Sequence, residues 1–536
     1  MASYFFLSFN FVVHAGPVAI FALASYIHFL RNDYDSFWAF VAYAAFWSYP
    51  FSVAYWHESH LPLAAVYVRV VQLLYIYLVD LWIYMAVYRL FLHRICHIPG
   101  PISLASSKLF WILVDVMGEN RIYSEHLHST YGDMVRIGPR EVSINDPGAV
   151  DVVLDNCGPC GKGPRLEIAY RGLLFLSHRH LSLEDGRARS EFVGPRLITT
   201  TRELMKQLEA ASRNGEPVNV RRWSLCASLD ALCSLAYSKS PNVLNEGPES
   251  SRLIAVERAL RQRSILGNVP YFGVALRDPL RGWNDWIEKT IGSGASPNVL
   301  SCLFGPEDHH GNVALALAAA ATAMSEVLAM VLYHLVADPY CYQAVRNEVF
   351  CVAGSKEFPS NIDQLTANDC PMLNAVIDET MRLHPPLASV GLHQRVTPPS
   401  GLVLPLRKGN VTLPRDVAVT IPLHVMQRDA RNFSPTPNEF HPRRWFAEQL
   451  RPTQFQKDVA TLNKVAYLPF GRTSSPIDDV AYMHLRIVIA SFVHQLDARF
   501  PPEFNKDAFL HSQDTSQKQS VLLLLSRRRR CRRGEE

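Results

Sequence analysis

Three apolar runs dominate the first hundred residues. They cover Phe5–Leu30, Phe37–Tyr55 and Leu61–Leu92. At a rise of about 1.5 Å per residue, each run is long enough as a helix to cross the roughly 30 Å hydrocarbon layer of a bilayer. Arg89 and Arg94 flank the end of the third run, and the positive-inside rule places that side in the cytoplasm. The pattern predicts up to three transmembrane helices, with the rest of the chain facing the cytosol.

Beyond the apolar runs, the pattern is mostly helical with short strand segments. A long alanine-rich run, Asn312–Val336, and the segment Pro371–Leu383 predict helices, the second one stopped by two prolines. Val480–Leu496 predicts a further buried helix. Alternating apolar and polar positions across Tyr131–Pro147 predict a β-hairpin, and Gly401–Asp429 predicts short strands separated by turns. The expected fold class is mainly α with small β-sheets (α+β).

The two prolines of His97–Pro101 mark the end of the membrane part, because proline stops a helix and stiffens the chain. We therefore expect a membrane region over residues 1–96, a main domain over 97–526 and a basic tail over 527–536. The tail is interpreted as a solvated terminus, with contact to anionic lipid as the alternative.

Composition supports membrane attachment and excludes other classes. The 536 residues are 48% hydrophobic and 19% charged, and the net charge of +4 is too small and dispersed to indicate nucleic-acid binding. The ten cysteines are irregularly spaced, as reduced thiols are, and none lies between Cys370 and Cys531. His178, His180 and Glu307–His310 fall in predicted loops and are interpreted as solvated, so no metal site built from protein ligands is predicted.

One pair of charged residues stands out by its context. Glu379 and Arg382 lie three residues apart on one helix face, close enough to pair, although this spacing alone is common. Downstream, Met426–Phe446 reads MQRDARNFSPTPNEFHPRRWF, and YLPFGR then precedes a helix. With these motifs the chain resembles the cytochrome P-450 superfamily, specifically the membrane-bound fungal haem-thiolate monooxygenases, over roughly His97–Leu525.

The resemblance implies a cofactor, partners and roles for particular residues. In the family, the ExxR pair (Glu379 and Arg382) and the arginine of a PERW motif, here Arg444, form a buried charged triad beneath the haem loop. Arg395 and Arg472 match family contacts to the haem propionates. An active member of this kind takes electrons from NADPH through NADPH-cytochrome P-450 reductase at the endoplasmic reticulum membrane. It hydroxylates an apolar small molecule, in fungi often in secondary-metabolite biosynthesis.

The haem loop departs from the family pattern, approximately FxxGxRxCxG, in which the cysteine thiolate binds the iron. Sulfur donates electron density that favours O–O cleavage. Counting back from the matching helix at Ala481, the ligand position falls on Ser475. The loop is also two residues short, and Ile477 replaces the glycine after the ligand. A serine hydroxyl is neutral at pH 7 and harder than sulfur, so the resemblance implies that the thiolate ligand is missing.

Two further elements depart from the family. In the long helix, the family carries an acid and an alcohol that help to deliver protons to bound oxygen. Here Thr322 occupies the acid position and Met324 an alcohol position. Thr322 either takes over part of that role or bonds the carbonyl four residues earlier in its own helix. Phe192 occupies the place of a family tryptophan near a propionate.

These observations leave three hypotheses. The first is a membrane-anchored monooxygenase homologue that has lost haem binding and activity, a pseudoenzyme, because three catalytic elements are altered while the fold triad remains. The second is an active NADPH-dependent monooxygenase whose sequence is misread at 470–480, for instance at a splice boundary. The third is a haem-free binding or scaffold protein that uses the old substrate cavity; no residue pattern supports it directly.

Overall fold

The computed structural model describes residues 18–20, 22–27, 63–117, 119–155, 158–162, 193–266, 310–353, 369–386, 393–446, 461–470, 476–513 and 520–528. The chain divides into two compact units. The first contains Met1–Phe110 and Arg136–Arg140, and the second contains Trp111–Val135 and Glu141–Glu536. The boundary expected at His97 from the proline pattern stays a prediction.

The first unit is built around one long apolar helix. Helix α3 (Leu63–Val87) continues as a π-helical turn, η1 (Tyr88–Leu92), and α4 (Ile102–Ser106) follows. Within this helix, Leu74–Leu92 has the length and hydropathy of a membrane span, and only 6% of it is buried against protein. The other two predicted spans lie largely outside the described residues, which include a short apolar helix over Val18–Ile27.

The glycine of the IPGP segment is required by a close backbone approach. A Cβ atom on Gly100 would lie 2.3 Å from the carbonyl oxygen of Arg136. Arg136 N donates to the Pro99 carbonyl oxygen at 2.8 Å on the same stretch. Any side chain at position 100 would therefore push apart two backbones that are hydrogen-bonded one residue away.

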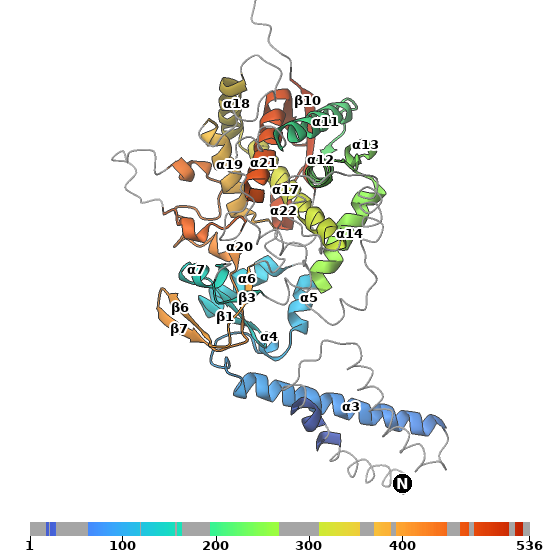
Figure 1. Cartoon of the computed structure of the whole chain (residues 1–536), viewed down its shortest axis with the longest axis vertical. Helices are drawn as coiled ribbons and strands as arrows, with labels where there is room; N and C mark the ends of the chain where they lie inside the picture. The colour runs from blue at the N-terminus through green and yellow to red at the C-terminus, as the bar shows by residue number, and fades with distance from the viewer. Residues whose placement is uncertain are drawn as a thin grey trace, which may run out of the picture. The chain divides into compact units, whose positions relative to one another are not determined.

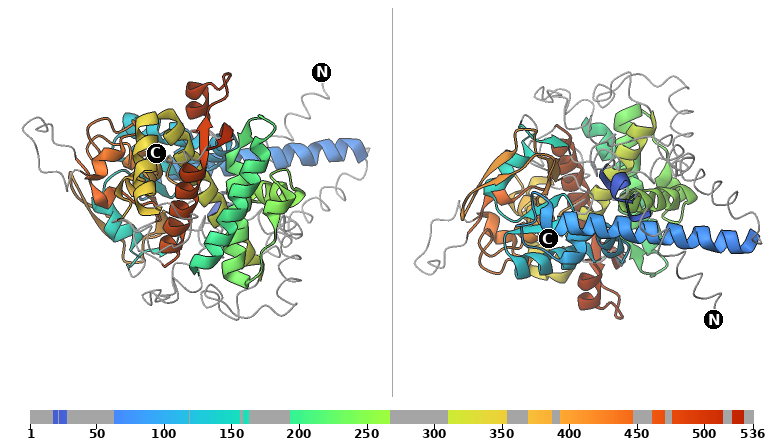
Figure 2. Two further views of the ribbon diagram at one scale, coloured as in Figure 1. Left: turned by 90° about the horizontal axis from the view of Figure 1, so that it is seen from above. Right: turned by 90° about the horizontal axis from the view of Figure 1, so that it is seen from below.

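The second unit is mainly helical, and its core lies between α12 (Val220–Tyr237), α17 (His310–Ala337) and α21 (Pro476–Gln495). Figure 1 shows α17, α19 and α21 beside one another, and Figure 2 shows the red α21 alongside the green α11. The remaining helices of the described chain are α5 (Leu109–Met117), α6 (Asn120–Tyr131), α7 (Gly148–Leu154), α11 (Gly194–Ser212), α13 (Val243–Glu246), α14 (Ser251–Leu266), α18 (Pro339–Ala353), α19 (Pro371–Leu383), α20 (Leu423–Met426), η4 (Pro442–Phe446), η5 (Lys464–Ala466) and α22 (Lys506–Gln513).

Helix α17 is as apolar as a membrane span, yet it is a core helix. Its segment Leu317–Ala337 passes the same length and hydropathy test as Leu74–Leu92, but 72% of it is buried inside the protein. Small alanines such as Ala318 and Ala321 are completely buried and let α12 pack closely against it. The predicted helix over Asn312–Val336 is confirmed, and its described side chains, from Leu317 onward, are mostly buried.

Short strands surround the helical core. The five-stranded sheet has the order β1 (Met134–Gly138), β2 (Glu141–Ile144), β8 (Ala418–Thr420), β5 (Gln394–Val396) and β3 (Gly161–Lys162). Strands β2 and β8 are parallel, and β5 is antiparallel to both β8 and β3. The remaining strands of the described chain are the hairpin β6 (Leu402–Leu406) and β7 (Gly409–Leu413), and β4 (Val218–Asn219), β10 (Leu522–Arg527) and β9 (Leu496–Arg499). The predicted fold class, mainly α with small β-sheets, is confirmed.

Helix α21 differs from its prediction at the N-terminal end. The apolar pattern predicted a start at Val480, but the helix begins at Pro476. Proline fits the first helical turn because it has no amide hydrogen to leave unpaired there. Asp478 and Asp479 also fall in that turn, where negative charge is favourable at the positive end of the helix dipole. Because these residues are polar, a prediction based on apolar periodicity did not include the first turn.

Candidate functional site

The central charged pair lies on α19. Pro371 begins this helix, and the chain leaves it at His384, directly before Pro385 and Pro386. One helical turn brings Glu379 and Arg382 together. Arg382 Nε donates to Glu379 Oε2 and Arg382 Nη2 donates to Glu379 Oε1, both at 2.9 Å. Both side chains are 0% exposed, so this is a two-point ion pair inside the protein.

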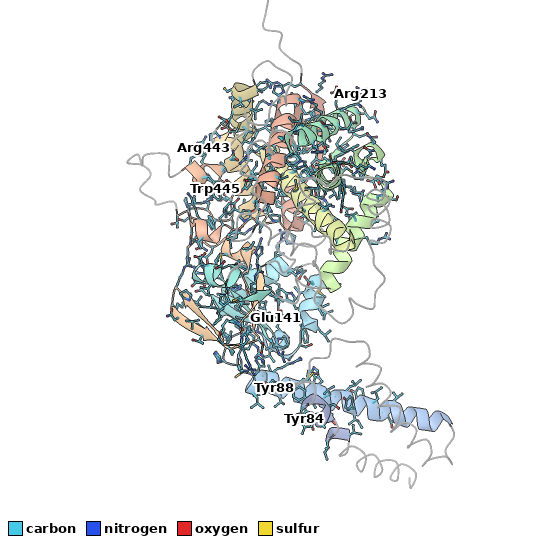
Figure 3. All side chains as sticks on the ribbon, viewed as in Figure 1. Tyr84, Tyr88, Glu141, Arg213, Arg443 and Trp445 are labelled. Carbon is cyan, nitrogen blue, oxygen red and sulfur yellow. The ribbon has the colours of Figure 1, made fainter. Side chains whose placement is uncertain are left out.

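The turn η4 completes the set of charges. Arg444 Nε donates to Glu379 Oε1 at 2.9 Å, and the backbone N–H of His441 donates to the same oxygen at 2.9 Å. Trp445 Nε1 donates to Glu379 Oε2 at 3.1 Å. Figure 3 marks Trp445 on this turn, together with its neighbour Arg443. The triad expected from the sequence, Glu379 with Arg382 and Arg444, is therefore present.

Two guanidinium groups face one carboxylate, and backbone carbonyls compensate the excess positive charge. Arg382 also donates to the carbonyl oxygens of Gln427, Pro437 and Glu439, at 2.7, 2.6 and 3.3 Å. Arg444 donates to two further carbonyls in the preceding turn, at 3.3 and 3.0 Å. Burial lowers the pKa of Arg444, and the carboxylate of the triad opposes that shift. Buried charges are tolerated here because each has hydrogen-bond partners.

Arg443 departs from the family motif at a position that lies outside the triad. It occupies the place of the usual PERW glutamate, and its side chain is exposed, whereas Arg444 next to it is buried. Successive residues of a tight helical turn point in different directions, so this position makes no part of the triad.

The hydroxyl of Thr322 on α17 forms the bond within its own helix, which was the second of the two possibilities considered for it. Its Oγ1 donates to the Ala318 carbonyl oxygen at 2.9 Å, and Ser325 Oγ donates to the Thr322 carbonyl oxygen at 2.8 Å. Helix α17 runs without interruption from His310 to Ala337. The hydroxyl is thus occupied by its own helix, which is the local bonding expected of a helical threonine.

Replacing Thr322 by alanine is expected to leave the free energy of unfolding within about 0.5 kcal/mol of the parent, because alanine's helix propensity offsets the lost local bond. Urea unfolding followed by circular dichroism measures this. Ser325→Ala, which removes a bond of the same kind, is the matched control. A loss of more than about 2 kcal/mol confined to the Thr322 variant would show that this hydroxyl has a role outside its helix.

Arg395 is the one predicted propionate contact whose position is described. It lies half-buried on β5, and its Nη1 donates to the Gln394 carbonyl oxygen at 3.1 Å. Burial lowers its pKa, and the nearby thiol of Cys160 opposes that shift. A guanidinium in this setting suits a carboxylate such as a propionate. Arg472, Ser475 and Phe192 lie outside the described residues.

The thiols that the structure describes lie on elements other than the segment before α21. Cys226 lies buried in α12 and Cys341 in α18, and burial raises the pKa of each thiol to about 12. Both remain protonated at neutral pH. Within the described residues, no three His, Cys, Asp or Glu side chains are grouped to hold a metal ion. The chain has no cysteine between Cys370 and Cys531, so its donors do not fit a haem-thiolate centre.

The structure also reveals residues that the sequence reasoning missed. Asp378, directly before Glu379, is half-buried and accepts hydrogen bonds from Tyr467 and Tyr482. Both tyrosines flank the altered loop, which was the only available signal. Their partner lies 89 and 104 positions away in the sequence, so spacing along the chain could not predict the contact.

Comparisons with known proteins agree with this fold and triad. The family model for cytochrome P-450 matches residues 303–524. The cytochrome P-450 monooxygenase orf5 of Eupenicillium brefeldianum is 28% identical over 82% of this chain and 92% of its own length. The monooxygenase FCK2 of Fusarium pseudograminearum is 28% identical over 80% of each chain, and the tryprostatin B 6-hydroxylase of Aspergillus fumigatus is 25% identical over 79% of each. The family model and these relatives support membership of the cytochrome P-450 superfamily, and the three relatives named are fungal proteins.

Proposed function

We propose that this chain is a membrane-anchored cytochrome P-450 monooxygenase homologue, of a lineage serving secondary-metabolite biosynthesis, that does not catalyse monooxygenation. The observation that carries the proposal is Ser475 at the ligand position, in a chain without cysteine between Cys370 and Cys531. The hydroxyl of Thr322, which is bonded to its own helix, supports the proposal. It belongs to a second catalytic element that also lacks the family's usual groups.

The chemistry of the donor explains the loss. A bound haem would supply oxygen activation in this family, and cleavage of the O–O bond depends on electron density from a thiolate. A serine hydroxyl stays protonated at neutral pH and does not donate electron density to iron as a thiolate does. Arg395 and Arg472 can pair with haem propionates, but such contacts hold the edge of the ring and leave the iron without its protein ligand.

The membrane anchor is proposed from the first unit. Leu74–Leu92 is apolar, long enough to span and almost entirely unburied by protein. Arg94 follows it, which places the second unit on the cytoplasmic side under the positive-inside rule. We infer attachment to the endoplasmic reticulum membrane from the family resemblance.

A second candidate is favoured by one observation. Five residues separate Phe470 from the start of α21 at Pro476, and this segment is shorter than the family's haem loop. If the natural sequence restored a cysteine and the missing residues, the protein would be an active monooxygenase. It would use NADPH through the reductase to hydroxylate an apolar small molecule. Haem-free binding or scaffolding has no comparable support.

The test measures haem per polypeptide in the full chain purified from cells supplied with a haem precursor. We expect far less than one haem per chain, and an Arg395→Ala variant should retain still less because it loses a propionate contact. One tightly held haem per chain would contradict the proposal. Sequencing the transcript across Tyr467–Arg486 decides the second candidate, since a restored cysteine codon would support it.

A further inference from the structure

Adjacent acidic residues on α19 serve two separate networks. Successive positions of an α-helix point about 100° apart. Glu379 therefore faces the triad, while Asp378 faces the segments on either side of residues 471–475. Tyr467 OH donates to Asp378 Oδ1 at 2.9 Å and Tyr482 OH donates to the same oxygen at 2.7 Å. The two hydroxyl oxygens are 3.4 Å apart. Tyr467 precedes the altered loop, and Tyr482 lies in α21 after it.

Partial burial shifts the protonation of all three members of this cluster. Burial raises the pKa of Asp378, while the two phenol hydrogen bonds and Arg486 oppose that shift. Burial also raises the pKa of Tyr467 and Tyr482 well above the usual range for tyrosine, so both phenols keep their protons and act as donors. A buried carboxyl that has two such donors costs much less free energy than one without partners.

Matching positions one turn away extend the contact between α19 and α21. Asn374 lies four residues before Asp378, and Arg486 lies four residues after Tyr482, so each pair shares one helix face. Arg486 Nε donates to Asn374 Oδ1 at 2.7 Å. The Arg486 guanidinium also lies 5.3 Å from the centre of the Tyr482 ring. The two helices are thus joined along a stripe of two turns.

Aromatic contacts join the cluster to the segment before the loop and to the triad. The Tyr467 ring meets the Trp445 ring edge-on with centroids 4.6 Å apart, and Phe470 meets Tyr482 in the same way at 5.6 Å. Trp445 also donates to Glu379. The residues at both ends of the altered loop are therefore held to α19 by side-chain contacts of the protein.

We propose that Asp378, Tyr467 and Tyr482 form a clamp that positions both ends of the altered loop and keeps the domain folded without haem. A tightly bound cofactor stabilises a native state by mass action, and a chain without it depends on contacts of its own. Asp378 is a positioning residue that acts through the two tyrosines. This inference rests on the proposed loss of productive haem binding.

Hydrogen exchange on the full chain tests the clamp. Protein is prepared with haem synthesis blocked and with haem supplied, and exchange is followed in peptides covering residues 461–470 and 476–486. We expect equal protection in both preparations. Asp378→Ala, which removes the oxygen that both tyrosines bond, is expected to speed exchange in both peptides by about tenfold or more, and to lower the melting temperature by about 2–4 °C. Tyr237→Phe is the matched control, because it removes a buried tyrosine hydroxyl that has no hydrogen-bond partner among the described residues.

The possible outcomes separate this inference from the proposed function. Exchange within twofold of the parent in Asp378→Ala, or protection that appears only with haem, would overturn the clamp. If Asp378→Ala does not fold, Tyr467→Phe and Tyr482→Phe decide. Their effects on exchange should be non-additive because both hydroxyls bond one oxygen, and additive effects would overturn the clamp. A stoichiometric haem would contradict the proposed function alone, since the haem-blocked samples still report on the clamp.

Discussion

Replacing Glu379 by alanine is expected to prevent the second unit from folding. The substitution leaves Arg382 and Arg444, both buried, facing each other without the carboxylate that now accepts from both at 2.9 Å. Removing one partner from a buried ion pair typically costs about 3–5 kcal/mol. The Trp445 indole and the His441 amide also lose their acceptor. Since domains are stable by about 5–15 kcal/mol in total, we expect loss of soluble protein and of cooperative unfolding.

Arg443→Ala provides the matched control for this prediction. It removes an arginine from the same turn, but one whose side chain is exposed and takes no part in the triad. Its free energy of unfolding should stay within about 0.5 kcal/mol of the parent. Soluble yield, circular dichroism and denaturant unfolding of the two variants give the comparison. A Glu379→Ala variant that unfolds like Arg443→Ala would show that the triad does not support the fold.

Acid is expected to unfold the domain between about pH 6.5 and pH 4, because several buried histidines must stay neutral in the folded state. Burial lowers the pKa of His334 and His393 to about 3 and that of His484 to about 4. Burial, with nearby Arg428 and Arg121, also lowers the pKa of His384 and His424 well below the usual value.

The sign of this effect follows from linkage. A histidine whose folded pKa lies below its unfolded value of about 6.5 binds protons more readily when unfolded. Its contribution to stability is fully present above that value and is lost as the pH falls towards the folded pKa. Each such histidine removes about 1.4 kcal/mol per pH unit. The three with folded pKa values of about 3 to 4 together remove about 4 kcal/mol by about pH 5.5, a large part of the stability of a whole domain.

Circular dichroism and tryptophan fluorescence measured across this pH range test the prediction. His484→Gln should reduce the pH dependence of the free energy of unfolding by about the contribution of one bound proton, because it removes one of the buried histidines. His511→Gln, at an exposed position on α22, is the control and should change nothing. Constant stability from pH 7 to pH 4.5 would contradict the account of the histidines.

Local patterns predicted the elements that depend on local chemistry. The prolines around Pro371–Leu383 set the ends of α19, and the three-residue spacing of Glu379 and Arg382 predicted their ion pair. The bond from Thr322 to Ala318 was also predictable, since it lies within one helical turn. Arg444 entered the triad through the family resemblance, because its position relative to α19 depends on the whole chain between them.

Other features depend on distant contacts and escaped the sequence reasoning. The first turn of α21 carries aspartates, so apolar periodicity placed its start four residues late. The partners of Asp378 come from segments about a hundred positions away, and a half-buried aspartate is indistinguishable from a surface one by sequence alone. Hydropathy likewise scores Leu74–Leu92 and the core helix segment Leu317–Ala337 alike, and only burial separates them.

The most direct test of the central claim is a carbon-monoxide difference spectrum of the full chain, purified from haem-supplied cells and reduced. Thiolate-ligated iron gives a characteristic band that other ligands do not give. With Ser475 in place of the cysteine, the account predicts that this band is absent, even when free haem is added. A thiolate band from a polypeptide confirmed by mass spectrometry to carry this sequence would contradict it.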